Sequence, residues 1–127
     1  MLKRQLDIQV ENVDSVAVVS LAGAIDPTNV DDFKSALKPL CSEPPAVVLL
    51  DCGDLSYVSS TSLGLLFYFH RICQASQGTL ALCCVWDKIQ NILRLLGLDT
   101  VLRIYKTRED GVKSLQEEAK KAAKAKT

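Results

Sequence analysis

Residues 46–73, AVVLLDCGDLSYVSSTSLGLLFYFHRIC, join an apolar run, a hydroxyl-rich turn and a second apolar run without interruption. The first run, residues 46–50, is apolar at every position, which is typical of a strand that is covered on both faces. Turn-forming residues follow, and we therefore expect the strand to end near Asp51. The second run, residues 63–69, predicts a helix.

Four consecutive hydroxyl side chains separate this strand from this helix: Ser59, Ser60, Thr61 and Ser62. Ser and Thr are preferred N-caps because the side-chain oxygen accepts a hydrogen bond from a free amide of the first turn. Those amides and the helix dipole also favour negative charge. We expect the helix to begin inside the run near Ser60, whose hydroxyl is then both a candidate cap and a candidate phosphate acceptor.

These residues resemble the STAS domain of bacterial anti-sigma factor antagonists. The family motif runs Asp-Ser-Ser/Ala-Gly-Leu-Gly-x-Leu, and residues 59–66 read Ser-Ser-Thr-Ser-Leu-Gly-Leu-Leu. The resemblance implies that an anti-sigma kinase phosphorylates Ser60, with Thr61 as the reserve candidate. The chain departs from the motif at Ser59, where the family has Asp, and at Ser62, where it has Gly. We expect Ser62 to fall in the first helical turn, where a residue other than glycine is unstrained.

A second stretch carries the same resemblance. Residues 16–23 predict a nearly continuous apolar strand, and Gly23-Ala24-Ile25-Asp26 matches the Gly-x-Leu/Ile-Asp sequence that ends the second strand in the family. The resemblance places Asp26 beside the hydroxyl turn, on the surface that faces the kinase. Asp before Pro is also an ordinary signal for the start of a helix, so Asp26 has a purely structural alternative. The partner-binding residues implied are Asp26, Ser59, Ser60, Thr61, Ser62 and Leu63.

Strands and helices alternate along the rest of the chain. Residues 6–10 alternate apolar and polar side chains, which predicts a half-exposed strand that opens a hairpin. Helices are expected at about 28–41, 60–77, 87–96 and 108–121, and strands at 79–85 and 101–105. The order predicts an α/β domain with a mixed β-sheet, an opening hairpin and about four helices, and the resemblance makes this domain STAS-like.

Length and composition fit a single domain, because 127 residues with 48% hydrophobic and 24% charged side chains can bury a core. We assign residues 1–127 to one STAS domain, with a core at about 5–116 and a charged helical tail at 117–127. The net charge is zero, from 15 basic and 15 acidic side chains, so nucleic-acid binding is not expected. Apolar runs fall short of the roughly 20 residues of a spanning helix, so direct membrane insertion is not expected either.

The sequence predicts neither a metal site nor a disulfide framework. The cysteines are odd in number and lack CxxC spacing: Cys41, Cys52, Cys73, Cys83 and Cys84. Free cysteines favour a reducing compartment, and we expect a cytoplasmic location. His70, the one histidine, is expected in the core or at its rim. Without a phosphate-binding glycine loop or a nucleophile paired to a base, we expect neither an enzyme nor a cofactor.

The resemblance therefore implies an anti-sigma factor antagonist that acts by partner switching. Such a protein binds an anti-sigma factor/serine-protein kinase when unphosphorylated and is released by Ser phosphorylation, which a PP2C-type phosphatase reverses. The alternative is a non-enzymatic STAS subunit of a membrane transport assembly of the ABC type, or of another signalling assembly without a phosphoswitch. The helix at 60–77 carries apolar side chains on more than one face. The extra apolar face predicts either a site for a partner or for weak self-association, or a helix that is buried between the sheet and a neighbouring helix.

Overall fold

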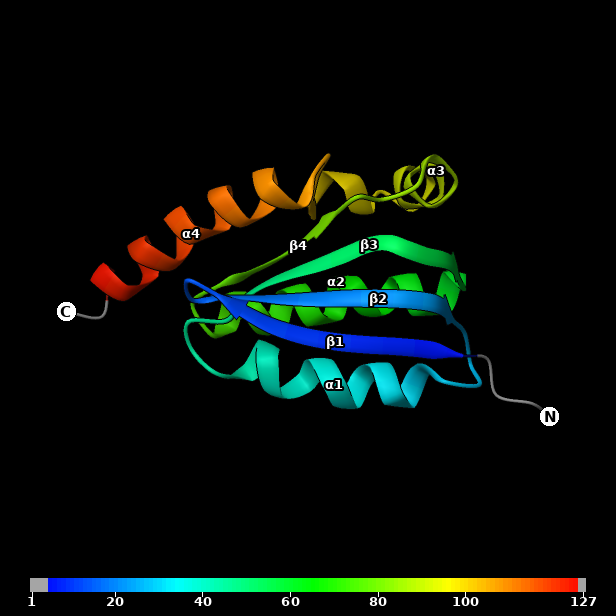
Figure 1. The fold of residues 1–127 in the computed structure, drawn as a ribbon, viewed down its shortest axis with the longest axis horizontal. Coiled ribbons are helices and arrows are strands. Elements are labelled where there is room, and N and C mark those ends of the chain that lie inside the picture. Colours follow the sequence, from blue (N-terminus) through cyan, green and yellow to red (C-terminus); the bar gives the residue numbers. More distant parts are fainter. Residues whose placement is uncertain (1–4, 126–127) are drawn as a thin grey trace.

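The five strands of the sheet follow one another in space in the order β1-β2-β3-β4-β5 (Figure 1). The computed structural model describes residues 5–125. Its strands are β1 (Leu6–Val13), β2 (Val16–Ile25), β3 (Val47–Val58), β4 (Thr79–Cys83) and β5 (Arg103–Tyr105). Its α-helices are α1 (Val30–Ser42), α2 (Ser60–Ala75), α3 (Asp87–Leu95) and α4 (Arg108–Ala125), with a 3-10 turn at Leu98–Thr100.

The opening hairpin and the mixed sheet are confirmed. β1 and β2 are antiparallel, whereas β2, β3, β4 and β5 pair in parallel. Val13 pairs with Val16, so Asp14 and Ser15 alone connect the two strands. Their φ angles of 47° and 72° are both positive, as the type I′ turn of a two-residue hairpin requires. The fold is a single α/β domain, as the sequence predicted.

Alternate residues of β3 supply the cores on the two faces of the sheet. Val48 and Leu50 pack with buried residues of α1 and α2, whereas Val47 and Leu49 pack with Leu115 of α4. Figure 1 shows α4 and α1 on opposite sides of the sheet. Because both faces of β3 are covered, both sets of side chains must be apolar, which explains the uniform apolar run at 46–50.

The prediction that this strand ends near Asp51 is wrong, because β3 continues to Val58. Its pairing with β2 shifts register twice, between Ser20 and Ala22 and between Gly23 and Ala24. The Gly53 amide donates to Asp51 Oδ1 at 3.0 Å, so the turn-forming residues satisfy their own polar groups inside a bulge. β4 stops opposite Asp51, and the rest of β3 therefore extends beyond its neighbour.

The last helix continues through most of the segment predicted as a charged helical tail. α4 runs to Ala125, and its buried Leu115 and Ala119 pack on the sheet. The boundary expected at 117 thus lies within a helix that covers one face of the sheet. The assignment of residues 1–127 to one domain stays a proposal, because residues 1–4 and 126–127 lie outside the described part. Among the helices at 5–125, none combines the length and apolarity needed to cross a membrane.

His70 is a core residue, as expected. Its side chain is buried on α2, and its Nδ1 accepts a hydrogen bond from the Leu80 amide of β4 at 3.3 Å. Burial lowers the pKa of His70, so the neutral imidazole that accepts this bond is favoured. The side chain therefore ties α2 to the sheet.

Candidate functional site

The hydroxyl turn lies where β3 passes into α2, against the end of β2. Val58 pairs with Ile25 in the last step of the parallel ladder, and the Ser59 amide donates to the Ile25 carbonyl at 2.9 Å. Asp26 follows Ile25 directly, so the loops after β2 and β3 begin side by side at the carboxyl edge of the sheet. This edge is where open α/β sheets usually bind their ligands.

Ser59, and not Ser60, caps α2. Ser59 has extended angles, φ −68° and ψ 153°, and its Oγ accepts a hydrogen bond from the Ser62 amide at 3.2 Å. The two hydroxyls of Ser59 and Ser62 also lie 2.7 Å apart and share a hydrogen bond. The expectation that Ser60 is a cap is therefore wrong. Since β3 runs on to Val58, Ser59 is the residue that turns the chain, and Ser60 is already helical.

The six candidate partner-binding residues divide by exposure. Ser60 and Thr61 are exposed, and Asp26 and Ser59 are half-buried. Ser62 is 2% exposed and Leu63 is 1% exposed, so these two side chains support the turn from within and do not present themselves to a partner. Ser62 lies inside the first turn of α2 and has no left-handed φ, which confirms the prediction that serine replaces the family glycine without strain.

Asp26 organises the turn that leads from β2 into α1. Its Oδ1 accepts hydrogen bonds from the Thr28 amide at 2.8 Å and from the Thr28 hydroxyl at 2.5 Å. Its own amide donates to Asn29 Oδ1 at 3.1 Å, and buried Asn29 donates in turn to the Ala24 carbonyl at 2.8 Å. The structural alternative for Asp26 is thereby confirmed. Its role toward a kinase stays a prediction.

Because Ser59 caps the helix and Ser60 does not, alanine substitutions at these two serines should differ in their effect on stability. Ser59→Ala should lower the free energy of unfolding by about 0.5–2 kcal/mol, because it removes the cap. Ser60→Ala should stay within about 0.5 kcal/mol of the wild type, because exposed surface substitutions usually do. Denaturant midpoints of the two variants measure the difference. Equal losses would show that Ser60 also holds the turn.

Two further features on this side of the molecule were not predicted from the sequence. Gly64 is exposed on α2, and a Cβ added there would meet no atom within 4 Å. A cleft of about 420 Å³ separates residues 53–56 of β3 from Trp86, Lys88 and Ile89 at the start of α3. Trp86 Nε1 donates to the Gly53 carbonyl at 2.8 Å while the ring stays 61% exposed. The sequence signal for this cleft was the single Trp, which directly follows the strand expected at 79–85.

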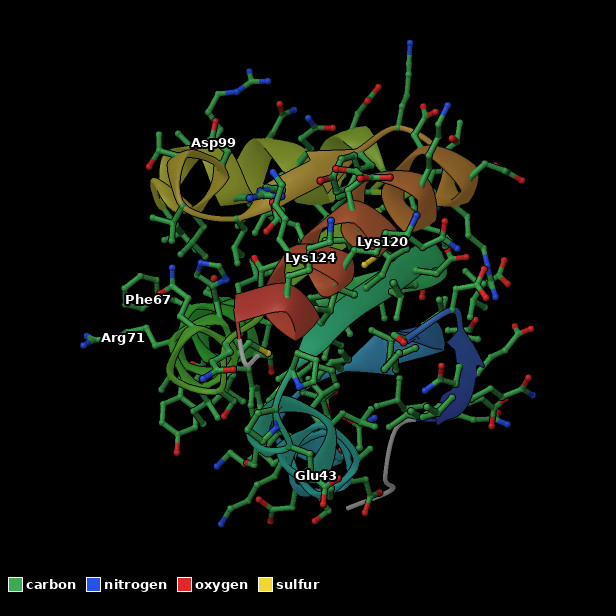
Figure 2. The ribbon with its side chains drawn as sticks, turned by 90° about the vertical axis from the view of Figure 1, so that its left-hand side faces the viewer. Glu43, Phe67, Arg71, Asp99, Lys120 and Lys124 are labelled. Atoms are coloured by element: carbon green, nitrogen blue, oxygen red, sulfur yellow. The ribbon has the colours of Figure 1, made fainter. Side chains whose placement is uncertain are left out.

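The extra apolar surface predicted for the helix at 60–77 exists. Phe67 and Tyr68 are exposed on α2, and Figure 2 shows Phe67 and Arg71 projecting outward from this helix. The Arg71 guanidinium lies 6.0 Å from the centre of the Phe67 ring, at the outer limit of a cation–π contact. The buried apolar residues of the helix are Leu63, Leu66, Phe69 and Cys73.

Comparison with known proteins identifies one family. The sequence model described as STAS domain matches residues 7–111. BtrV of Bordetella bronchiseptica, named a candidate anti-sigma factor antagonist, is 21% identical over 104 residues, which cover 82% of this chain and 90% of BtrV.

Solved structures share the fold. An anti-sigma factor antagonist from Mycobacterium paratuberculosis matches with a TM-score of 0.80 at 21% identity, covering 88% of this chain and 95% of its own. The phosphorylated form of SpoIIAA, a cell fate determinant of Bacillus, matches at 0.67 and 20% identity, covering 85% and 98%. A sulfate transporter family protein from Wolinella succinogenes matches at 0.72 and 18% identity, covering 88% and 93%. At these identities the likeness establishes the fold alone.

Proposed function

The chain belongs to the STAS domain family, and from that premise we propose that it is an anti-sigma factor antagonist that acts by partner switching. Unphosphorylated, it binds an anti-sigma factor that is also a serine kinase, and phosphorylation of Ser60 releases it. The observation that carries the proposal is the exposed Ser60 hydroxyl on the first turn of α2, next to a cap that Ser59 supplies. The protein acts by binding and does no chemistry of its own.

The first turn of α2 suits a phosphate on Ser60. It carries no acidic side chain, and the amides and dipole at a helix start favour negative charge. A phosphate of roughly −1.5 to −2 charges is therefore tolerated by the domain itself. The same charge inside a close interface repels acidic groups and must be desolvated. The modification then acts on the partner's affinity and leaves the fold unchanged.

Thr61 is the reserve acceptor because it is also exposed on this turn. Ser62 is a poor acceptor, since the residue is only 2% exposed and a kinase must reach its hydroxyl. Phosphopeptide mapping after incubation with the cognate kinase tests the assignment. Phosphate confined to Ser59 or Ser62, or to no residue of the turn, would exclude it. A PP2C-type phosphatase that restores the hydroxyl completes the proposed cycle.

The glycine at position 64 supports the proposal that a partner packs closely on this face of α2. It stands one helical turn after Ser60, and its open surroundings mean that the fold has room for a side chain there. Glycine inside a helix costs roughly 0.5–1 kcal/mol relative to alanine, so a partner that packs on the bare backbone gives a reason for it.

Gly64→Ala should therefore stabilise the isolated domain by about 0.5–1 kcal/mol while weakening the partner complex. Thermal or denaturant unfolding gives the first quantity, and titration with the anti-sigma factor gives the second. A variant that gains stability and keeps full affinity would show that the partner does not approach this glycine.

The alternative function is a subunit of a membrane transport assembly. Ser59 in place of the family's Asp leaves this alternative open, and the same fold occurs in a sulfate transporter family protein. Proteins that copurify with the tagged native protein distinguish the two functions. An anti-sigma kinase supports partner switching, whereas transporter subunits without phosphate on Ser60 support the alternative. The proposed cytoplasmic location and weak self-association go with either function.

A further inference from the structure

Asp51, Cys83 and Cys84 come together at the carboxyl ends of β3 and β4. Asp51 and Cys83 are direct partners in the parallel pairing, so their side chains project from the same face of the sheet, the face that α4 covers. Cys84 follows with a left-handed φ of 59°, which returns its side chain to this face. The Asp51 carboxylate oxygen and the two sulfurs all lie within 4.8 Å of one another.

We propose that Asp51, Cys83 and Cys84 form a site for a thiophilic divalent cation of the Zn²⁺ type. Thiolate sulfur and carboxylate oxygen are ligands that zinc accepts, at about 2.3 Å and 2.0–2.2 Å, in a tetrahedral arrangement. Ligand atoms at such distances are separated by roughly 3.5–4 Å, so the three side chains need to close by only about an ångström. Each thiol passes its proton to water as its sulfur–metal bond forms.

The site reaches the surface through Asp51 and Cys84. The Asp51 side chain is 18% exposed. Cys83 is buried, whereas Cys84 is half-buried, which leaves the fourth position open to water. This is the pattern of three protein ligands and one exchangeable position.

The Arg108 guanidinium competes with a metal ion for the Asp51 carboxylate. Its Nη1 lies 3.3 Å from Asp51 Oδ2, a loose ion pair, and 3.2 Å from the Ser20 hydroxyl. Its Nη2 makes a closer pair with Glu11 at 2.7 Å, which can hold the guanidinium when the metal takes Asp51. The sequence predicted no metal site because the spacing of the cysteines alone does not reveal that Asp51 joins them.

Titration of the reduced full-length protein with Cd²⁺ tests the site, since cadmium–thiolate bonds absorb in the ultraviolet. We expect a band that saturates at one equivalent and that Zn²⁺ displaces. Cys84→Ser should lower the band at saturation to about half, because one thiolate remains, and should weaken binding at least about tenfold, because loss of even an outer partner of a metal ligand commonly costs about 10–100-fold. Asp51→Asn should weaken binding while keeping the band. Arg108→Gln should tighten metal binding, because it removes the guanidinium that pairs with Asp51.

Cys52→Ala is the matched control, because Cys52 is adjacent in sequence to Asp51 but packs in the core on the opposite face. It should bind Cd²⁺ as the wild type does, and circular dichroism checks that each variant is folded. A wild-type protein without a saturable band overturns the proposal. So does a band that survives Cys84→Ser in full, or one that Cys52→Ala reduces equally.

Discussion

Phosphorylation of Ser60 should weaken the complex with the anti-sigma factor by at least about 100-fold, or about 2.7 kcal/mol. Like charges brought together in an interface cost several kcal/mol, and the phosphate must also lose water. Ser60 lies on the exposed side of the first turn of α2, so a partner that contacts this turn meets the phosphate directly. Calorimetric titration of the phosphorylated and unmodified protein measures the change.

Three variants separate charge from position in this experiment. Ser60→Asp should weaken binding less than the phosphate does, because it adds one charge and fewer acceptor oxygens. Ser60→Ala should keep both affinity and stability, since Ser59 supplies the cap. Ser35→Asp adds the same charge at an exposed position of α1 and should leave affinity unchanged. Unaltered affinity after stoichiometric phosphorylation of Ser60 would contradict the switch.

The division of roles between two adjacent serines is what makes such a switch compatible with a stable fold. Ser59 caps the helix through its hydrogen bonds to Ser62, so the Ser60 side chain is not needed as a cap. A charge placed on Ser60 therefore leaves the cap of α2 in place, and the helix dipole favours that charge. Stability and partner affinity can then change independently, which the sequence alone does not predict because four hydroxyls stand in one run.

Much of the fold follows from local patterns in the sequence. The uniform apolar run at 46–50 predicted a strand covered on both faces, and the helical spacing after the hydroxyl turn predicted α2. The end of β3 was wrong because Asp51 and Gly53 form a bulge whose existence depends on pairing with β2. Whether turn-forming residues end a strand or bulge within it is decided by a neighbour distant in sequence.

The candidate site was predictable only in part for the same reason. The motif at 59–66 located the turn, and its exposed members are Ser60, Thr61 and Gly64. The burial of Ser62 and Leu63 depends on how α2 packs on the sheet, and the approach of Asp51 to Cys83 depends on the register of β3 with β4. Neither packing nor register can be read from the spacing of residues along one segment.

The largest loss of stability is expected for Gly78→Ala, at about 3 kcal/mol or more. Gly78 follows α2, where its amide donates to the Cys73 carbonyl at 2.8 Å, and it lies against the residue that precedes β3. A Cβ at Gly78 would stand 1.9 Å from the Ala46 oxygen and 2.8 Å from the Ala46 nitrogen. These are backbone atoms, so no side-chain rotation can relieve the overlap.

The backbone around Ala46 is also fixed by its own hydrogen bonds. The Ala46 amide donates to the Ser76 carbonyl at 3.1 Å, and the Ala46 carbonyl accepts from the Thr79 amide at 3.0 Å. Making room for a methyl group at Gly78 would separate β3 from β4 at their first paired residues and withdraw the end of α2. Gly64→Ala is the matched control, because the same methyl group there meets nothing and should raise stability by about 0.5–1 kcal/mol. Denaturant unfolding of both variants gives the comparison, and a Gly78→Ala variant within about 1 kcal/mol of the wild type would mean that this close approach is not required.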